Sequence, residues 1–290
     1  MVLSSLDSLK IKKMNQDQTP VNSAAKQQVI EALKKANNIL ITVSQNPSID
    51  QLAGCIGLAL ALNKLNKHAT AIFSGTVPST IEFLQPEKTL ETNTDSLRDF
   101  IISLDRNKAD KLRYKVEDNV VRIFITPYRT SLSEKDFIYS QGDFNVDAVI
   151  ALGVDQREHL DQAIMQQGRI LHDAVVMGVS AGANPSNVGA INWHEPAACG
   201  ISELVVGISD AMQGGLLDDQ ISTALLTGIV SETDRFRNEK TTAKVMTISA
   251  QLMAAGANQQ LVAQQLDTRP QPQAQPDAAA AMSTGKPSPQ

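Results

Sequence analysis

The sequence has few cysteines, no excess of positive charge and no long apolar run. Its two cysteines, Cys55 and Cys199, are too few for a disulfide framework in 290 residues. We therefore expect small buried thiols and a reducing, cytoplasmic setting. The formal net charge of −5 indicates no basic surface at the level of the whole chain, so we do not expect nucleic acid to be held tightly. A local basic groove is the alternative that this charge leaves open.

Long apolar segments are also missing. None approaches the roughly 18 apolar residues of a membrane-spanning helix, so we expect no membrane contact. Residues 1–20 lack the apolar centre of a signal peptide. Residues 268–290 hold five prolines and no large aliphatic residue. We expect a flexible segment over 1–22, a folded domain over 23–266 and a disordered tail over 267–290.

What the sequence does contain is a short apolar run at 39–43, a polar turn and an almost wholly apolar segment at 52–65. This order predicts a buried strand, a turn and a buried helix. Ser48 and Gln51 have the spacing of a capping box at the helix start. Ligands bind outside the carboxyl ends of parallel strands, so this turn is the first place to look for chemistry.

Strands and helices alternate through the rest of the chain. We expect further strands at 70–73, 147–152, 173–177 and 188–192, and helices at 23–36, 200–212, 220–230, 241–255 and 258–266. Asp218 and Asp219 lie at the positive end of one of these helices. The alternation predicts an α/β fold with a doubly wound, mostly parallel sheet and helices on both faces.

Residues 77–144 depart from this pattern. Leu112–Val116 and Val120–Ile125 flank a polar turn, which predicts a β-hairpin. Ser131 and Glu134 have the spacing of a helix cap. We interpret the segment as a small β-hairpin insertion at the sheet edge with a structural role, and partner binding is the alternative.

The turn after residue 43 resembles the first motif of the DHH phosphoesterases, the group related to bacterial oligoribonucleases and phosphoadenosine-phosphate phosphatases. That motif reads His-x-x-Pro-Asp-x-Asp-Ala-x-Gly-Ser between a strand and a helix. Pro47 and Asp50 match it, whereas Ser44 and Ser48 stand at its His and its first Asp. Gly153 stands at the Asp of the second motif.

The later motifs follow in family order. Ser180-Ala181-Gly182 stands at the Asp-His-His of the third motif, and Asn192–Ala198 matches a downstream Asn-Trp-x-x-Pro-x-Ala element. Glu203 stands at a family Glu on the next helix, and Thr227–Arg237 corresponds to the fourth motif. The resemblance implies the DHH fold and hydrolysis of phosphoesters with two divalent metals, usually manganese. It also implies a second, substrate-gripping domain, of which we expect no counterpart in this sequence.

Of the metal ligands that the resemblance implies, the sequence keeps Asp50, with Glu232 as a substitute for another. Serine, glycine and alanine at the other positions are poor ligands for hard dications. We therefore expect no metal cofactor and a catalytically degenerate domain that acts by binding a nucleotide, a phosphate or a protein partner. The candidate pocket residues are Ser44, Asn46, Ser48, Asp50, Gly153, Asp155, Ser180, Gly182, Asn184 and Glu232.

Loops of this composition can hold phosphate through backbone amides without a metal. No basic residue lies in the turn at 44–50 or in the loop at 180–184, so we expect modest affinity.

The alternative is an active Mn²⁺-dependent phosphoesterase that hydrolyses nucleotides or short oligonucleotides, with Asp50, Asp155, Glu232 and Asp234 as ligands. Against it, Asp155 and Glu158 have the spacing of a capping box, and Asp50 suits the first turn of its helix. The histidines show no ligand spacing and we interpret them as structural: His68, His159, His172 and His194.

Overall fold

The structure is a computed structural model that describes residues 22–267. Both terminal segments of the sequence analysis lie almost entirely outside this range. A central sheet of six parallel strands has the order β10-β9-β8-β1-β2-β3. Its strands are β1 (Asn38–Thr42), β2 (His68–Ile72), β3 (Leu90–Glu91), β8 (Ala148–Leu152), β9 (Val175–Ala181) and β10 (Ile191–Glu195).

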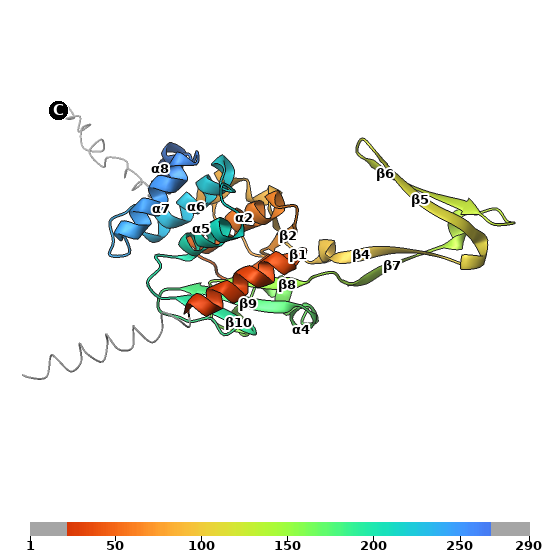
Figure 1. Cartoon of the computed structure of the whole chain (residues 1–290), viewed down its shortest axis with the longest axis horizontal. Coiled ribbons are helices and arrows are strands. Elements are labelled where there is room, and N and C mark those ends of the chain that lie inside the picture. The colour runs from red at the N-terminus through yellow and green to blue at the C-terminus, as the bar shows by residue number, and fades with distance from the viewer. Residues whose placement is uncertain (1–21, 268–290) are drawn as a thin grey trace, which may run out of the picture.

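The sheet is doubly wound, as the sequence predicts. The chain builds outward from β1 through β2 to β3, then returns to place β8 on the other side of β1 and continues to β9 and β10 (Figure 1). The winding direction therefore reverses between β1 and β8. In an open α/β sheet this switch point is where the loops diverge and leave a crevice.

Two strand predictions are wrong. The strand expected at 173–177 ends later than predicted, because β9 continues through Ser180 and Ala181. The strand expected at 188–192 forms later, as β10. Asn192 accounts for the shift, because its Oδ1 accepts hydrogen bonds from the amides of Val188 (3.2 Å) and Gly189 (3.3 Å) and so holds these residues in a turn.

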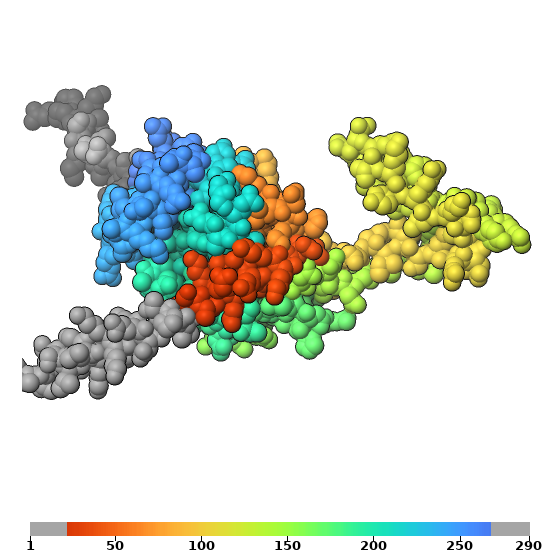
Figure 2. Space-filling model, in the orientation of Figure 1, coloured from red at the N-terminus to blue at the C-terminus, as the bar shows by residue number. Residues whose placement is uncertain are grey.

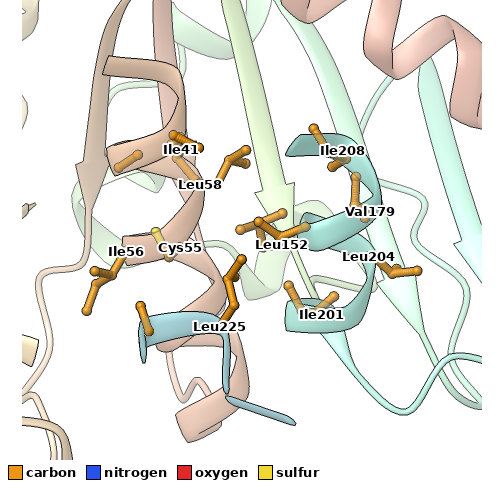
Figure 3. Packing of buried hydrophobic residues seen from close by; sticks show 14 of the residues in the cluster. Ile41, Cys55, Ile56, Leu58, Leu152, Val179, Ile201, Leu204, Ile208 and Leu225 are labelled. Carbon is orange, nitrogen blue, oxygen red and sulfur yellow. The ribbon is translucent and has the colours of Figure 1, made fainter. Parts of the chain in front are cut away.

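The main core lies on one face of the sheet (Figure 3). The helices there are that of residues 22–35, α2 (Ile49–Lys64), α5 (Ile201–Met212), α6 (Asp219–Glu232), α7 (Ala243–Ala254) and α8 (Gln259–Leu266). Helix α2 is apolar on all sides from Leu52 to Leu62, as suits a helix buried between the sheet and neighbouring helices. At Gly57 an added Cβ would come within 2.6 Å of Leu225, so glycine permits close contact with α6.

A second core covers the opposite face. It lies beneath two short helices, α3 (Gln162–Met165) and α4 (Ile170–Asp173), and the 3₁₀ helix η3 (Asp95–Leu97). Other 3₁₀ helices, η1 (Ser79–Leu84) and η2 (Pro86–Lys88), connect β2 to β3. Within residues 22–267 no helix is both long enough and apolar enough to cross a bilayer.

The insertion is much larger than the predicted small hairpin. Residues 98–144, here called the arm, form two successive two-stranded antiparallel ribbons that project from the body (Figures 1 and 2). The inner ribbon pairs β4 (Arg98–Leu104) with β7 (Phe137–Phe144), and the outer ribbon pairs β5 (Ala109–Glu117) with β6 (Val120–Pro127).

The outer ribbon contains the hairpin expected around residues 117–119. The cap expected from Ser131 and Glu134 is wrong. Ser133 and Asp136 form the box instead, around the 3₁₀ helix η5 (Glu134–Asp136).

Candidate functional site

A cleft of about 490 Å³ opens at the carboxyl ends of β1 and β8, at the switch point of the sheet. All ten candidate residues line it: Ser44, Asn46, Ser48, Asp50, Gly153, Asp155, Ser180, Gly182, Asn184 and Glu232. The loops at Ser44, Gly153, Ser180 and Glu232 therefore converge as the motif order predicts.

Gln51 connects two walls of the cleft. The predicted capping box is present, with the Ser48 amide donating to Gln51 Oε1 (2.9 Å) and the Gln51 amide donating to Ser48 Oγ (3.2 Å). Gln51 Nε2 also donates to the carbonyl of Gly153 (2.7 Å). One side chain therefore caps the start of α2 and ties its first turn to the loop after β8.

Gly153 has no room for a side chain. Its φ is +68°, a left-handed conformation that favours glycine, and an added Cβ would lie 2.0 Å from Gln51 Nε2. Gly153 stands at the Asp of the second motif, and the space that an Asp side chain would take there is occupied by the side-chain amide of Gln51. An aspartate fits here only if Gln51 moves away.

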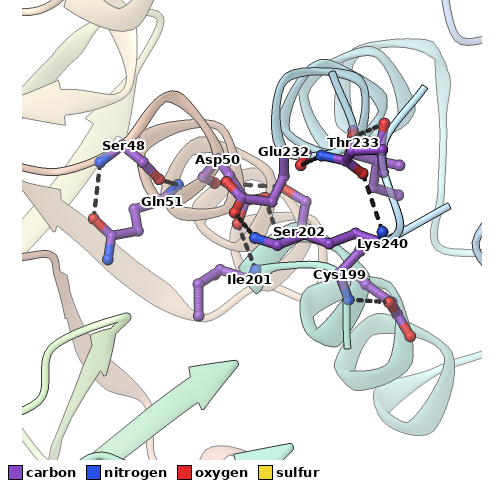
Figure 4. Close-up of polar contacts among 12 residues, drawn as sticks. Ser48, Asp50, Gln51, Cys199, Ile201, Ser202, Glu232, Thr233 and Lys240 are labelled. Carbon is purple, nitrogen blue, oxygen red and sulfur yellow. Dashed lines mark hydrogen bonds and ion pairs between the residues drawn. The ribbon is translucent and has the colours of Figure 1, made fainter. Parts of the chain in front are cut away.

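Asp50 is fully buried, and its carboxylate faces another helix (Figure 4). The amides of Ile201 and Ser202, at the start of α5, donate to its two oxygens at 2.5 and 2.9 Å. Its carboxylate therefore satisfies unpaired amides of α5, a larger role than the predicted first-turn preference in α2. Burial raises the pKa of Asp50, the α5 amides and the Ser202 hydroxyl oppose the rise, and the charge of Glu232 adds to it.

Glu232, the last residue of α6, is paired with Lys240. The two meet because the chain reverses at Asp234, Arg235 and Phe236, which all have positive φ. Lys240 lines the cleft, whereas Asp234 is not among the lining residues. Glu203, the family Glu of the sequence analysis, is buried, accepts from the Cys199 amide (2.8 Å) and pairs with Lys244 (2.6 Å).

Asp155 does not form the expected capping box with Glu158. Its Oδ1 accepts from the Gln156 amide (2.9 Å) and lies 2.6 Å from His159 Nδ1. The helix that follows is capped by Asp161, six residues after Asp155. The hydrogen bond and negative charge of Asp155 raise the pKa of His159, and the same bond lowers the pKa of Asp155.

Ser180 is buried between two strands and a loop. Its hydroxyl oxygen accepts from the Ser186 amide (3.0 Å) and lies 2.9 Å from His194 Nδ1. Gly182, just after β9, has φ of +75° and turns the chain so that residues 182–184 border the cleft. These contacts order the loop.

These side chains do not fit a two-metal centre. Within residues 22–267 no group of three or more His, Cys, Asp or Glu side chains is placed to hold a metal ion. Asp50 is committed to α5 and Glu232 to Lys240. Lys240 and His159, which line the same cleft, can instead offer an anion positive charge.

Sequence reasoning did not assign Gln51, His159 or Lys240 to the cleft. Gln51 carried a local signal, its capping box, which explains its position but not its contact with Gly153. Lys240 carried none, because its approach depends on a reversal after α6 that no glycine or proline marks.

No family model matches this sequence, and neither does any curated protein. Among solved structures, the chain resembles an exopolyphosphatase-related protein from Bacteroides fragilis with a TM-score of 0.61 and 13% identity, over 85% of this chain and 61% of that one. A putative family II inorganic pyrophosphatase from Methanococcus jannaschii gives a TM-score of 0.45 and 10% identity, over 79% and 59%.

This chain spans about three fifths of the length of the exopolyphosphatase-related protein (61%). At 13% identity the likeness concerns the fold alone. The chain shares the α/β fold of that exopolyphosphatase-related protein.

Proposed function

We propose that this protein is a catalytically degenerate binding domain whose cleft takes a phosphate group, free or on a nucleotide, without a metal. The observation that carries the proposal is the environment of Asp50. Both of its oxygens accept from amides of α5, and it is fully buried. The carboxylate that best matches a family ligand therefore stabilises the fold.

The other acidic groups are engaged as well. Glu232 is paired with Lys240 and Asp155 with His159. A two-metal site needs several oxygen ligands that are free to coordinate the two dications. Freeing them here means breaking two ion pairs and uncapping a helix, and Gly153 contributes no ligand.

The cleft has the groups that bind an anion. Lys240 and His159 line it, and the pKa of His159 is raised, so its positive charge extends to higher pH than usual. The turn at Gly182 and the start of α2 also line the cleft, and backbone amides of such segments can bind phosphate. Lys240 must be shared between Glu232 and the ligand, so we expect modest affinity.

Calorimetric titration with inorganic phosphate and a nucleotide panel, in chelator, tests this function. We expect saturable binding that Lys240→Ala weakens by roughly tenfold or more, because a charge-assisted contact is lost. The matched control is Lys34→Ala, which removes the same charge from the exposed surface of the helix of residues 22–35.

Three outcomes contradict the proposal. Equal binding by wild type and Lys240→Ala places the ligand elsewhere, and no binding across the panel leaves a protein-partner role. Manganese-dependent hydrolysis of an activated phosphodiester, lost in Asp50→Ala, supports the active phosphoesterase with Asp50, Asp155, Glu232 and Asp234 as ligands.

A further inference from the structure

The arm carries most of the exposed large apolar side chains. Of the seventeen in residues 22–267, thirteen lie between Phe100 and Tyr139. Leu112 and Tyr114 are 74% and 76% exposed, and Phe100 is 66% exposed. Ordinary surfaces show such residues singly, and a cluster of this size indicates an interaction site.

The outer ribbon has one apolar face and one charged face. Directly opposed residues in an antiparallel pair point to the same side. The pairs Leu112–Ile125, Tyr114–Ile123 and Val116–Val121 therefore form a wholly apolar face.

The alternate pairs form the other face of the outer ribbon. There Glu117 pairs with Lys115 and Arg122, and the Arg113 guanidinium lies over the Phe124 ring at 4.8 Å. The charged face has its partners within the chain, whereas the apolar face is uncovered.

The inner ribbon presents a similar face. Phe100, Ile102 and Leu104 of β4 share one side with Phe137 and Tyr139 of β7. The outer ribbon turns back at an angle from the far end of the inner one (Figures 1 and 2). The two apolar faces border a common groove of about 700 Å³ at this elbow.

An uncovered arm of this kind is poorly stabilised in water. Isolated two-stranded ribbons are marginal, and all four arm strands are edge strands with unpaired backbone groups. Eight of the exposed apolar residues lie on the two facing surfaces. At roughly 100 Å² each they offer about 800 Å², the area that one partner contributes to a standard interface.

We propose that the arm is a self-association surface, on which the apolar faces of both ribbons are covered by the same faces of a second copy around a twofold axis. Such an isologous contact needs a self-complementary surface. The arm meets this requirement, because its faces match in chemistry and it has nine basic and eight acidic residues over 98–144. A strongly charged partner finds no complementary field here.

A lipid surface fits these observations less well. The two apolar faces border one groove at an angle, and a flat bilayer can cover only one of them at a time. Entering the hydrocarbon core would also leave the open strand edges without hydrogen-bond partners. The other ribbon of a second copy covers both faces and can pair with the edges.

Sedimentation velocity of the full chain over a concentration series tests the proposal. We expect reversible dimers, and we expect Tyr114→Lys with Ile123→Lys to raise the dimer dissociation constant by roughly thirtyfold or more, as loss of a buried anchor does. The matched control, Val120→Lys with Thr126→Lys, adds the same charges to the opposite face of the same ribbon. It should leave the dimer intact.

Hydrogen exchange of the wild type provides a readout that does not depend on variant folding. Amides of β5 and β6 should exchange more slowly at high protein concentration than at low concentration. If the protein is monomeric at every concentration, the proposal is wrong. The apolar faces would then be covered either by closure of the elbow or by another protein. Dimers that persist in the Tyr114→Lys and Ile123→Lys variant also contradict the proposal. Flotation of monomers with phosphatidylcholine–phosphatidylglycerol vesicles contradicts it as well, because it assigns the apolar faces to lipid.

Discussion

Individual residues of the cleft also stabilise the fold. Asp50 matches the family motif and still lies in the cleft, but its partners are the first amides of α5. A helix begins with amides that lack intrahelical partners, and those of α5 are buried. The carboxylate therefore stabilises the contact between α2 and α5.

Asp50→Ala should lower the free energy of unfolding by about 2–4 kcal/mol, because it leaves buried amides without acceptors. Glu232→Ala removes a partly exposed ion pair and should cost no more than about 1 kcal/mol. Urea denaturation of both variants provides the comparison. Equal losses would mean that Asp50 is not the structural cap of α5.

Gly153→Ala should destabilise the protein for two separable reasons. A left-handed φ costs a non-glycine residue about 1–2 kcal/mol, and the new Cβ meets Gln51. In a Gln51→Ala background the second contribution disappears, so the same change should cost less. A double-mutant cycle in denaturant measures this coupling, and strict additivity of the two changes would contradict the contact.

At the scale of elements, the loops after β1 and β8 hold each other in place. The Gln45 amide donates to the His159 carbonyl (3.0 Å), and the Asp161 amide donates to the Val43 carbonyl (3.0 Å). Ser44 also forms a bridge with Leu160. These contacts place His159 at the cleft.

Anion binding at the cleft should weaken as pH rises through the pKa of His159. That pKa is raised above its usual 6.5 by Asp155, with Glu158 contributing. Below it the imidazolium attracts phosphate, and above it the ring is neutral, so the attraction is lost. Calorimetry from pH 6 upward should show this loss in wild type but not in His159→Gln.

Phosphate itself gains negative charge over the same pH range, so the informative quantity is the difference between the wild type and His159→Gln. Parallel titration curves would show that His159 does not contact the ligand. Lys34→Ala again serves as the charge-matched surface control.

At the scale of the whole molecule, the cleft and the arm lie at opposite ends of the sheet. The arm leaves the body at Arg98 and returns at Phe144, just before the amino end of β8, whereas the cleft lies beyond its carboxyl end. A dimer formed through the arms therefore leaves both clefts open. Ligand binding and self-association should be separable.

The sequence by itself determined the order of elements and the fold, because these depend on local patterns. Apolar runs of strand and helix length, and capping residues such as Ser48 and Asp218, act within a few positions of themselves. The parallel sheet then brings strand ends together, which is why every candidate pocket residue reaches one cleft.

Only the tertiary structure decided what those residues contact. Asp50 and Ile201 are 151 positions apart, and Gln51 and Gly153 are 102 apart. Spacing alone does not encode such pairs, because they depend on how α2 lies against its neighbours. The same holds for the arm: its alternation predicts strands, but the strand register and the elbow determine that two apolar faces border one groove and remain exposed.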